Sequence, residues 1–143
     1  MITVCVTTYN RVERTIDSFS NVLGHPLVSE VVIMDDASED SNFQSLNDLI
    51  QKLDTNKISL FRNEKNLGAF LNKMECVKKA SNDWVVLLDS DNTIDNSYID
   101  ALPTDKVDNC FYLPVFAKTP SNAFDFTRHS GRTFYNDGFI ELI

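Results

Sequence analysis

Strand-like and helix-like segments alternate over the first 92 residues of this chain, which has 143 residues in all. Four short apolar runs have the length of strands, at residues 2–7, 30–34, 58–61 and 84–88. Between them, apolar residues recur every three or four positions, as on one face of a helix. This order predicts right-handed crossovers and an α/β fold, with a mostly parallel central sheet that carries helices on both faces.

Residue patterns also predict where these elements begin and how they are covered. Asn10 and Glu13 have the spacing of a capping box, so we expect Asn10 to cap a first helix that begins at about Arg11. The fourth strand is apolar throughout, which is typical of a parallel strand covered on both faces. The expected third helix carries an apolar stripe, formed by Leu67, Phe70, Leu71, Met74 and Val77.

The alternation weakens after residue 88. We expect a short helix over residues 98–102 and a strand over residues 110–117, which contains Pro114 and therefore suits a sheet edge or a bulge. No periodic pattern extends through residues 121–143.

Composition excludes several classes of partner. The chain has four glycines, too few to build a glycine-rich phosphate loop, so a nucleotide would have to be held by side chains and a metal. A net charge of −8 without a basic cluster argues against nucleic acid. The three cysteines lie far apart among apolar residues, which predicts buried thiols and a reducing compartment. Residues 1–11 lack the features of a signal peptide, and no apolar run is long enough to span a bilayer. We therefore expect a cytoplasmic protein without a transmembrane segment.

Polar residues follow each predicted strand at its carboxyl end, where parallel sheets bind ligands. If the first and fourth strands are neighbours, in the order 3-2-1-4, Tyr9 and Asp91 flank one crevice. Carboxylates gathered there repel one another and need a positive counter-charge. The sequence Asp89-Ser90-Asp91 offers hard oxygen ligands, which suit Mg²⁺ or Mn²⁺ beside substrate phosphates.

Four motifs in this region resemble those of family 2 glycosyltransferases and follow the same order. They are Val6-Thr7-Thr8-Tyr9-Asn10-Arg11, the run VIMDDASED over residues 32–40, Asn66-Leu67-Gly68 with Asn72, and Leu88-Asp89-Ser90-Asp91-Asn92. The resemblance covers about residues 2–92. It implies a Rossmann-like GT-A fold, a nucleotide-sugar donor that is usually a UDP-sugar, a divalent cation, and inversion at the anomeric carbon. The acceptor, whether a sugar, a lipid-linked group or a protein, is left open.

The resemblance also implies roles at the base. Tyr9 would stack on it, Thr7 would contact it, and Thr8 belongs to the same nucleotide-binding segment. Asp36 would accept a hydrogen bond from the base, which suits the N–H of uracil because a carboxylate only accepts.

Further roles are implied at the ribose and the diphosphate. Gly68 and Asn72 would shape the wall beside the ribose. Asp89 would lie near the ribose and the sugar, and Asp91, together with Asp89, would bind Mg²⁺ or Mn²⁺.

Two features depart from the family pattern. Leu71 stands directly before Asn72, where members often carry a basic residue. Lys73 follows Asn72, and Lys65 lies upstream. The family's catalytic base is a carboxylate of the acceptor-binding half and has no match here, where Asp137 and Glu141 are the late carboxylates.

These motifs suggest how a single GT-A-like domain is divided. We expect residues 1–95 to form the nucleotide-sugar-binding half and residues 96–143 to form only the start of the acceptor-side half.

Other interpretations of the acidic residues are open. Asp35 and Asp36 also suit a helix-capping turn. A calcium loop beginning at Asp89 would need glycine where Ile94 stands and glutamate where Asp100 stands. A receiver domain would need its aspartate pair after the first strand, and here the pair follows the second.

An inactive nucleotide-sugar-binding module is the remaining alternative. It would keep Tyr9, Asp36 and Asp91 and would lack only the catalytic base.

Overall fold

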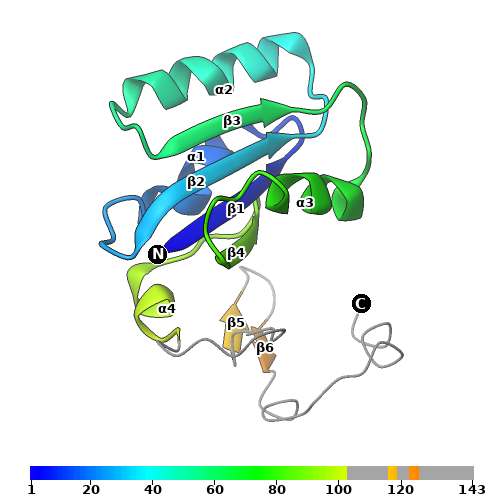
Figure 1. Ribbon diagram of the computed structural model, residues 1–143. Coiled ribbons are helices and arrows are strands. Elements are labelled where there is room, and N and C mark those ends of the chain that lie inside the picture. The colour runs from blue at the N-terminus through cyan, green and yellow to red at the C-terminus, as the bar shows by residue number, and fades with distance from the viewer. Residues whose placement is uncertain (103–115, 119–122, 126–143) are drawn as a thin grey trace. The chain divides into compact units, whose positions relative to one another are not determined.

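Each strand and helix expected in the first 92 residues is present in the structure, a computed structural model that describes residues 1–102, 116–118 and 123–125. The chain divides into two units, residues 1–101 and 102–143. The first contains β1 (Ile2–Thr8), α1 (Val12–Ser20), β2 (Val28–Asp35), α2 (Asp40–Lys52), β3 (Ile58–Arg62), α3 (Ala69–Val77), β4 (Trp84–Asp89) and α4 (Asn96–Asp100), as labelled in Figure 1.

The four strands of this unit form one parallel sheet in the order β3-β2-β1-β4. Thr7 of β1 is in register with Met34 of β2 on one side and with Asp89 of β4 on the other. Buried valines and isoleucines fill the middle of β1 and β2, as β-branched residues do in central strands. The order 3-2-1-4 brings the carboxyl ends of β1 and β4 side by side.

Helices cover both faces of the sheet, with α3 in front of it and α1 behind it in Figure 1. Successive residues of a strand point to opposite faces, and β1 makes both contacts. The Cys5 thiol lies 3.7 Å from the backbone oxygen of Cys76 in α3. The Thr8 hydroxyl lies 2.6 Å from the Thr15 hydroxyl in α1. The predicted α/β fold is confirmed.

Cys5 and Cys76 are buried free thiols, as expected, whereas Cys110 lies outside the described residues. A hydrogen bond with Cys5, together with burial, raises the pKa of the Cys76 thiol. Cys76 therefore stays protonated and serves as a small apolar residue of the core.

β4 differs from the expectation of a strand covered on both faces. Among the described strands it forms an edge of the sheet, beside β1. Leu87 is in register with Cys5, yet it is 48% exposed. The reason is that α3 packs through Cys76 against β1 and β2 and leaves Leu87 uncovered.

The start of α1 also differs from its prediction. Arg11 is the N-cap residue, the helix begins at Val12, and no side chain caps it. Asn10 has a positive φ of 52° and turns its side chain toward α2 instead. Its Oδ1 accepts hydrogen bonds from the backbone N–H of Glu39 (2.9 Å) and from Nδ2 of Asn42 (3.1 Å). Asn10 thus ties the end of β1 to the start of α2.

The apolar stripe that predicted α3 is not the buried face of that helix. The buried side chains of α3 are Asn72 and Cys76. Phe70 is 70% exposed, and Leu71 and Met74 are also exposed. The helix packs on the sheet through one small thiol and one hydrogen-bonded amide.

In the second unit the structure describes β5 (Phe116–Lys118), which pairs antiparallel with β6 (Ala123–Asp125). The expected strand over residues 110–117 coincides with β5 at residues 116 and 117, and its remainder lies outside the described residues. Asp137 and Glu141 lie outside them too. In the described part of the chain, no helix has the length and apolarity needed to cross a membrane.

Candidate functional site

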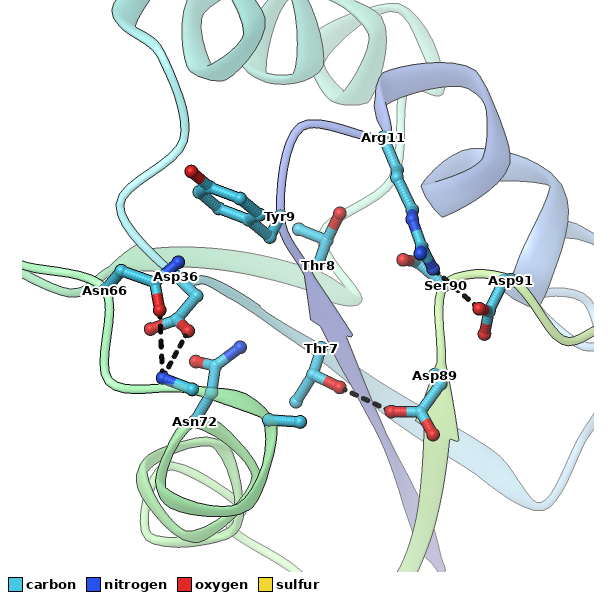
Figure 2. Close-up of a pocket in the computed structure, with 12 residues that line it drawn as sticks. Thr7, Thr8, Tyr9, Arg11, Asp36, Asn66, Asn72, Asp89, Ser90 and Asp91 are labelled. Carbon is cyan, nitrogen blue, oxygen red and sulfur yellow. Dashed lines mark hydrogen bonds and ion pairs between the residues drawn. The ribbon is translucent and has the colours of Figure 1, made fainter.

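A pocket of about 440 Å³ lies where β1, β2 and β4 end, beside the start of α3 (Figure 2). Its lining comes from four separate segments of the chain and consists of Thr7, Thr8, Tyr9, Arg11, Asp36, Asn66, Gly68, Ala69, Asn72, Asp89, Ser90 and Asp91. All eight residues that the sequence singled out are among them, so the fold gathers them in one place. Their roles toward a ligand remain predictions.

Asp36 is the anchor of one wall of the pocket. Its side chain is 3% exposed and accepts three hydrogen bonds. Oδ1 accepts from Nδ2 of Asn63 (2.9 Å) and from the N–H of Leu67 (2.8 Å), and Oδ2 accepts from the N–H of Gly68 (2.9 Å). A carboxylate has about four acceptor positions. One position on Oδ2 is therefore left for a further donor.

Asp35, the preceding residue, has a different task. Its Oδ2 accepts from the N–H of Ser38 at 3.0 Å and lies 3.3 Å from Nε of Arg62. This is the turn before α2, so the capping interpretation describes Asp35. Asp36 is the carboxylate that reaches the pocket.

Gly68 joins the Asp36 wall to α3. It has φ 82° and ψ 162°, a conformation almost exclusive to glycine, and is the N-cap residue of α3. Its N–H also lies 3.0 Å from Oδ1 of Asn66. The wall thus depends on backbone geometry that a side chain would strain.

Asn72 supports this wall through hydrogen bonds made by both its amide nitrogen and its amide oxygen. Nδ2 donates to the backbone oxygen of Met34 at 3.2 Å, and Oδ1 accepts from Nδ2 of Asn63 at 2.9 Å. Asn63 therefore bridges Asn72 and Asp36. It was missed as a functional residue because its sequence position shows only that it follows β3.

On the opposite wall, Thr7 and Lys73 hold Asp89. The Thr7 hydroxyl donates to Oδ1 of Asp89 at 3.0 Å, and Nζ of Lys73 lies 2.8 Å from Oδ2. Lys73 was noted in the sequence only as a neighbour of the motif. In the structure it is the cation that compensates the charge of Asp89.

Asp91 lies at the mouth of the pocket. Its Oδ2 lies 2.7 Å from a guanidinium nitrogen of Arg11, and both side chains are nearly half exposed. Figure 2 shows the Arg11 side chain extending toward this carboxylate, with a dashed line joining the two. A positive counter-charge for the acidic crevice is thus already present in the protein, in addition to any cation that binds.

Thr8, the last residue of β1, and Tyr9, which follows it, also line the pocket. The Tyr9 ring is 48% exposed and faces the Asp36 side of the pocket in Figure 2. The Thr8 hydroxyl is bonded to Thr15 of α1, so it points away from the carboxylates. An exposed aromatic ring beside a buried acceptor is suited to a flat heterocycle.

Four lining residues were not among the predicted site residues, namely Arg11, Asn66, Ala69 and Ser90. Arg11, Asn66 and Ser90 belong to the quoted motifs, so membership of a motif could have identified them. The sequence did not show that they turn toward the same cavity.

The acidic residues fit a divalent cation that shares its coordination with a ligand. In the described ranges no three His, Cys, Asp or Glu side chains form a group able to hold a metal. Asp89 and Asp91 offer hard oxygens, and Mg²⁺ is typically held by one or two carboxylates while phosphates and water complete its shell. These residues therefore suit a cation that arrives with a diphosphate better than a cation held by protein alone.

The family model of glycosyl transferase family 2 matches residues 3–139. A curated relative from Mus musculus, inactive polypeptide N-acetylgalactosaminyltransferase-like protein 5, is 29% identical over 94 residues, which is 66% of this chain and 22% of that protein. The chain thus spans about a fifth of the length of the curated relatives it matches.

Solved structures with the same fold include TarS of S. aureus in complex with UDP, with a TM-score of 0.57 and 27% identity over 70% of this chain and 30% of that one. The mannosyltransferase PcManGT of Pyrobaculum calidifontis, in complex with GDP-Man and Mn²⁺, has a TM-score of 0.55 and 22% identity. The superposition covers 63% of this chain and 27% of the PcManGT chain. This likeness shows the fold alone.

Proposed function

Because the chain belongs to glycosyl transferase family 2 and its sheet has the GT-A arrangement, we propose that it binds a UDP-sugar and takes part in moving that sugar to an acceptor hydroxyl with inversion. The observation that carries the proposal is the convergence of an exposed aromatic ring, a buried acceptor and an acidic pair in one pocket. Each suits a different part of a nucleoside diphosphate sugar.

The base would bind at the Asp36 wall. Tyr9 would stack on the ring, and the remaining acceptor position of Asp36 Oδ2 would take an N–H of uracil. The similarity to TarS, which was crystallised with UDP, supports uracil as the base. Thr7, Thr8, Gly68 and Asn72 would shape the cavity around the nucleoside.

The diphosphate would lie toward Asp89 and Asp91. Asp91, with Asp89, would hold Mg²⁺ or Mn²⁺, which when bound supplies positive charge at the leaving diphosphate. Lys73 and Thr7 hold Asp89 in a fixed orientation through hydrogen bonds of 2.8 and 3.0 Å. The protein's own contribution is thus an oriented carboxylate at the place where charge develops.

In the transfer step, the acceptor oxygen forms a bond to C1 of the sugar while the bond from C1 to the diphosphate oxygen breaks. The nucleoside diphosphate leaves with the bonding electron pair, and the acceptor proton passes to a general base. We place that base outside residues 1–102, in the acceptor-binding part of the protein.

Calorimetry with UDP, with and without Mn²⁺, tests the site. We expect UDP to bind in the presence of Mn²⁺ and Asp91→Asn to weaken this binding by tenfold or more, because the variant loses a charged ligand oxygen. Asp17→Asn is the matched control, since Asp17 is exposed on α1 outside the pocket. Binding that is independent of both metal and Asp91 would refute the assignment.

An inactive nucleotide-sugar-binding module is the second candidate, and one observation favours it. The curated relative with 29% identity is named as an inactive transferase-like protein. Release of UDP from UDP-sugars in the presence of candidate acceptors separates the two. UDP binding by the chain with no release of UDP from any of these sugars would favour the binding module.

A further inference from the structure

The ion pair between Arg11 and Asp91 links two sides of the pocket mouth. Arg11 precedes α1 and Asp91 follows β4, so 80 positions of sequence separate them, yet their charged atoms lie 2.7 Å apart. Both side chains line the pocket and are exposed by 44% and 43%. The pair therefore lies on the solvent-exposed part of the pocket lining.

The two acidic residues of this wall are held to different degrees. Asp89 has protein partners on both oxygens, Thr7 on Oδ1 and Lys73 on Oδ2. For Asp91 the structure gives one partner, Arg11 on Oδ2. Asp91 is thus the carboxylate that can lose Arg11 and bind another cation while the contacts of Asp89 with Thr7 and Lys73 stay in place.

The chemistry of the pair favours such an exchange. An ion pair exposed to this extent contributes little to stability, because water screens it and two long side chains must be ordered. A divalent cation at Asp91 would repel the guanidinium only a few ångströms away. A guanidinium released there has a planar fork of donors that matches phosphate oxygens.

We propose that Arg11 is an exchangeable partner of Asp91, which it neutralises in the free protein and leaves for the diphosphate when a divalent cation and the donor bind. This inference rests on the proposed function for the identity of the donor. It assigns to Arg11 two successive contacts, and it makes the residue a competitor of the metal and a ligand of the phosphate.

The two contacts predict opposite effects of Arg11→Gln on two affinities. For Mn²⁺ alone, measured by electron paramagnetic resonance of the free ion, we expect the variant to bind about two- to fivefold tighter, because the competing cation is gone. For Mn²⁺ with pyrophosphate, measured by calorimetry, we expect binding weaker by about tenfold, because a charged hydrogen bond is lost.

Arg14→Gln is the matched control, since it removes the same charge from an exposed position of α1 that does not line the pocket. It should change neither affinity by more than about twofold, because surface charges at a distance are screened. Arg11→Gln combined with Asp91→Asn should lose the gain in Mn²⁺ affinity, which ties the effect to the pair.

Arg11→Gln behaving like Arg14→Gln would overturn the inference, and so would two affinities that shift in the same direction. If neither the wild type nor Arg11→Gln binds Mn²⁺ at millimolar concentrations, the competition is absent and the inference is wrong. Because these measurements use no nucleoside, a failure of UDP to bind counts against the proposed function and leaves the Arg11 result to be judged by itself.

Discussion

Asp35 and Asp36 are adjacent in the chain, but their carboxylates serve different structures. Asp35 holds the turn before α2 through Ser38, whereas Asp36 holds the backbone of Leu67 and Gly68 at the pocket. The motif that resembles family 2 glycosyltransferases distinguished the two residues. Local propensity could not, because aspartate favours turns at both positions.

Other residue-scale features were beyond the sequence. The pairing of Lys73 with Asp89 joins a helix and a strand, and neither position shows it by itself. Such a contact depends on the packing of α3 on the sheet, which the residue pattern of that helix did not reveal.

The predicted role of Tyr9 can be tested with a single substitution. If the Tyr9 ring stacks on the base, Tyr9→Ala should weaken the binding of UDP and of uridine by the same amount, about 1–3 kcal/mol. Stacking involves the base, which both ligands have, and not the phosphates. Calorimetry with both ligands measures the two losses. Tyr9→Phe keeps the ring and should bind both almost as the wild type does. Unchanged affinity in Tyr9→Ala would contradict the stacking role.

At the scale of elements, α3 shows the limit of reading burial from apolar periodicity. Its stripe of Phe70, Leu71 and Met74 predicted the helix correctly, but these side chains are exposed. The helix approaches the sheet through Asn72 and Cys76, four positions apart on the other side. Hydrogen bonding of Asn72 to the backbone of Met34 made a polar residue the better contact there. Periodicity records apolar spacing and cannot detect a buried amide.

Because the buried side of α3 is polar and its apolar side is exposed, we expect an alanine substitution of the polar residue to cost more stability than one of the apolar residue. Asn72→Ala should lower the free energy of unfolding by about 1–3 kcal/mol, because it removes the two buried hydrogen bonds that the Asn72 amide makes with the Met34 carbonyl and with Asn63. Phe70→Ala should change it by no more than about 0.5 kcal/mol, as exposed substitutions usually do. Urea denaturation of both variants measures the difference. A larger loss in Phe70→Ala would show that this side chain is covered.

At the scale of the whole sheet, much was predictable. Parallel pairing follows from the alternating elements, and the position of the pocket follows from the polar residues at strand ends once the first and fourth strands are taken as neighbours, as they are in the structure. The exposure of Leu87 on β4 was not predictable, because a strand with apolar residues on both faces has the same composition whether or not helices cover both of them. A catalytic base could not be assigned from the sequence either, since no motif marks one.

A glutamate at the opposite end of the sheet from the pocket makes the stability of the fold depend on pH. Glu30 lies near the start of β2, and its Oε2 accepts from the Thr3 hydroxyl (2.6 Å) and from the backbone N–H and hydroxyl of Ser81 (both 2.9 Å). Burial raises the pKa of Glu30, but the hydrogen bonds from Thr3 and Ser81 together outweigh it, so its pKa is lowered from 4.5. The contribution of Glu30 is therefore fully present above its unfolded pKa and is lost as pH falls through its lower folded pKa.

Glu30→Gln should accordingly be less stable than the wild type at pH 7, and the difference should shrink as the pH falls below about 4.5. Urea midpoints between pH 7 and pH 3 measure it. Glu13→Gln removes the same charge from an exposed position of α1 and is the control. A difference between wild type and Glu30→Gln that does not change with pH would contradict the prediction.

The pocket is assembled from segments that begin at Thr7 and end at Asp91 and meet only in the folded sheet. An unfolded chain therefore has no binding site, and any ligand of the pocket must shift the folding equilibrium toward the native state. A ligand at one hundred times its dissociation constant adds about 2.7 kcal/mol of stability. The melting temperature of this chain is thus a reporter of its own ligand, and a panel of nucleoside diphosphates ranked by that temperature identifies the base without any knowledge of the acceptor.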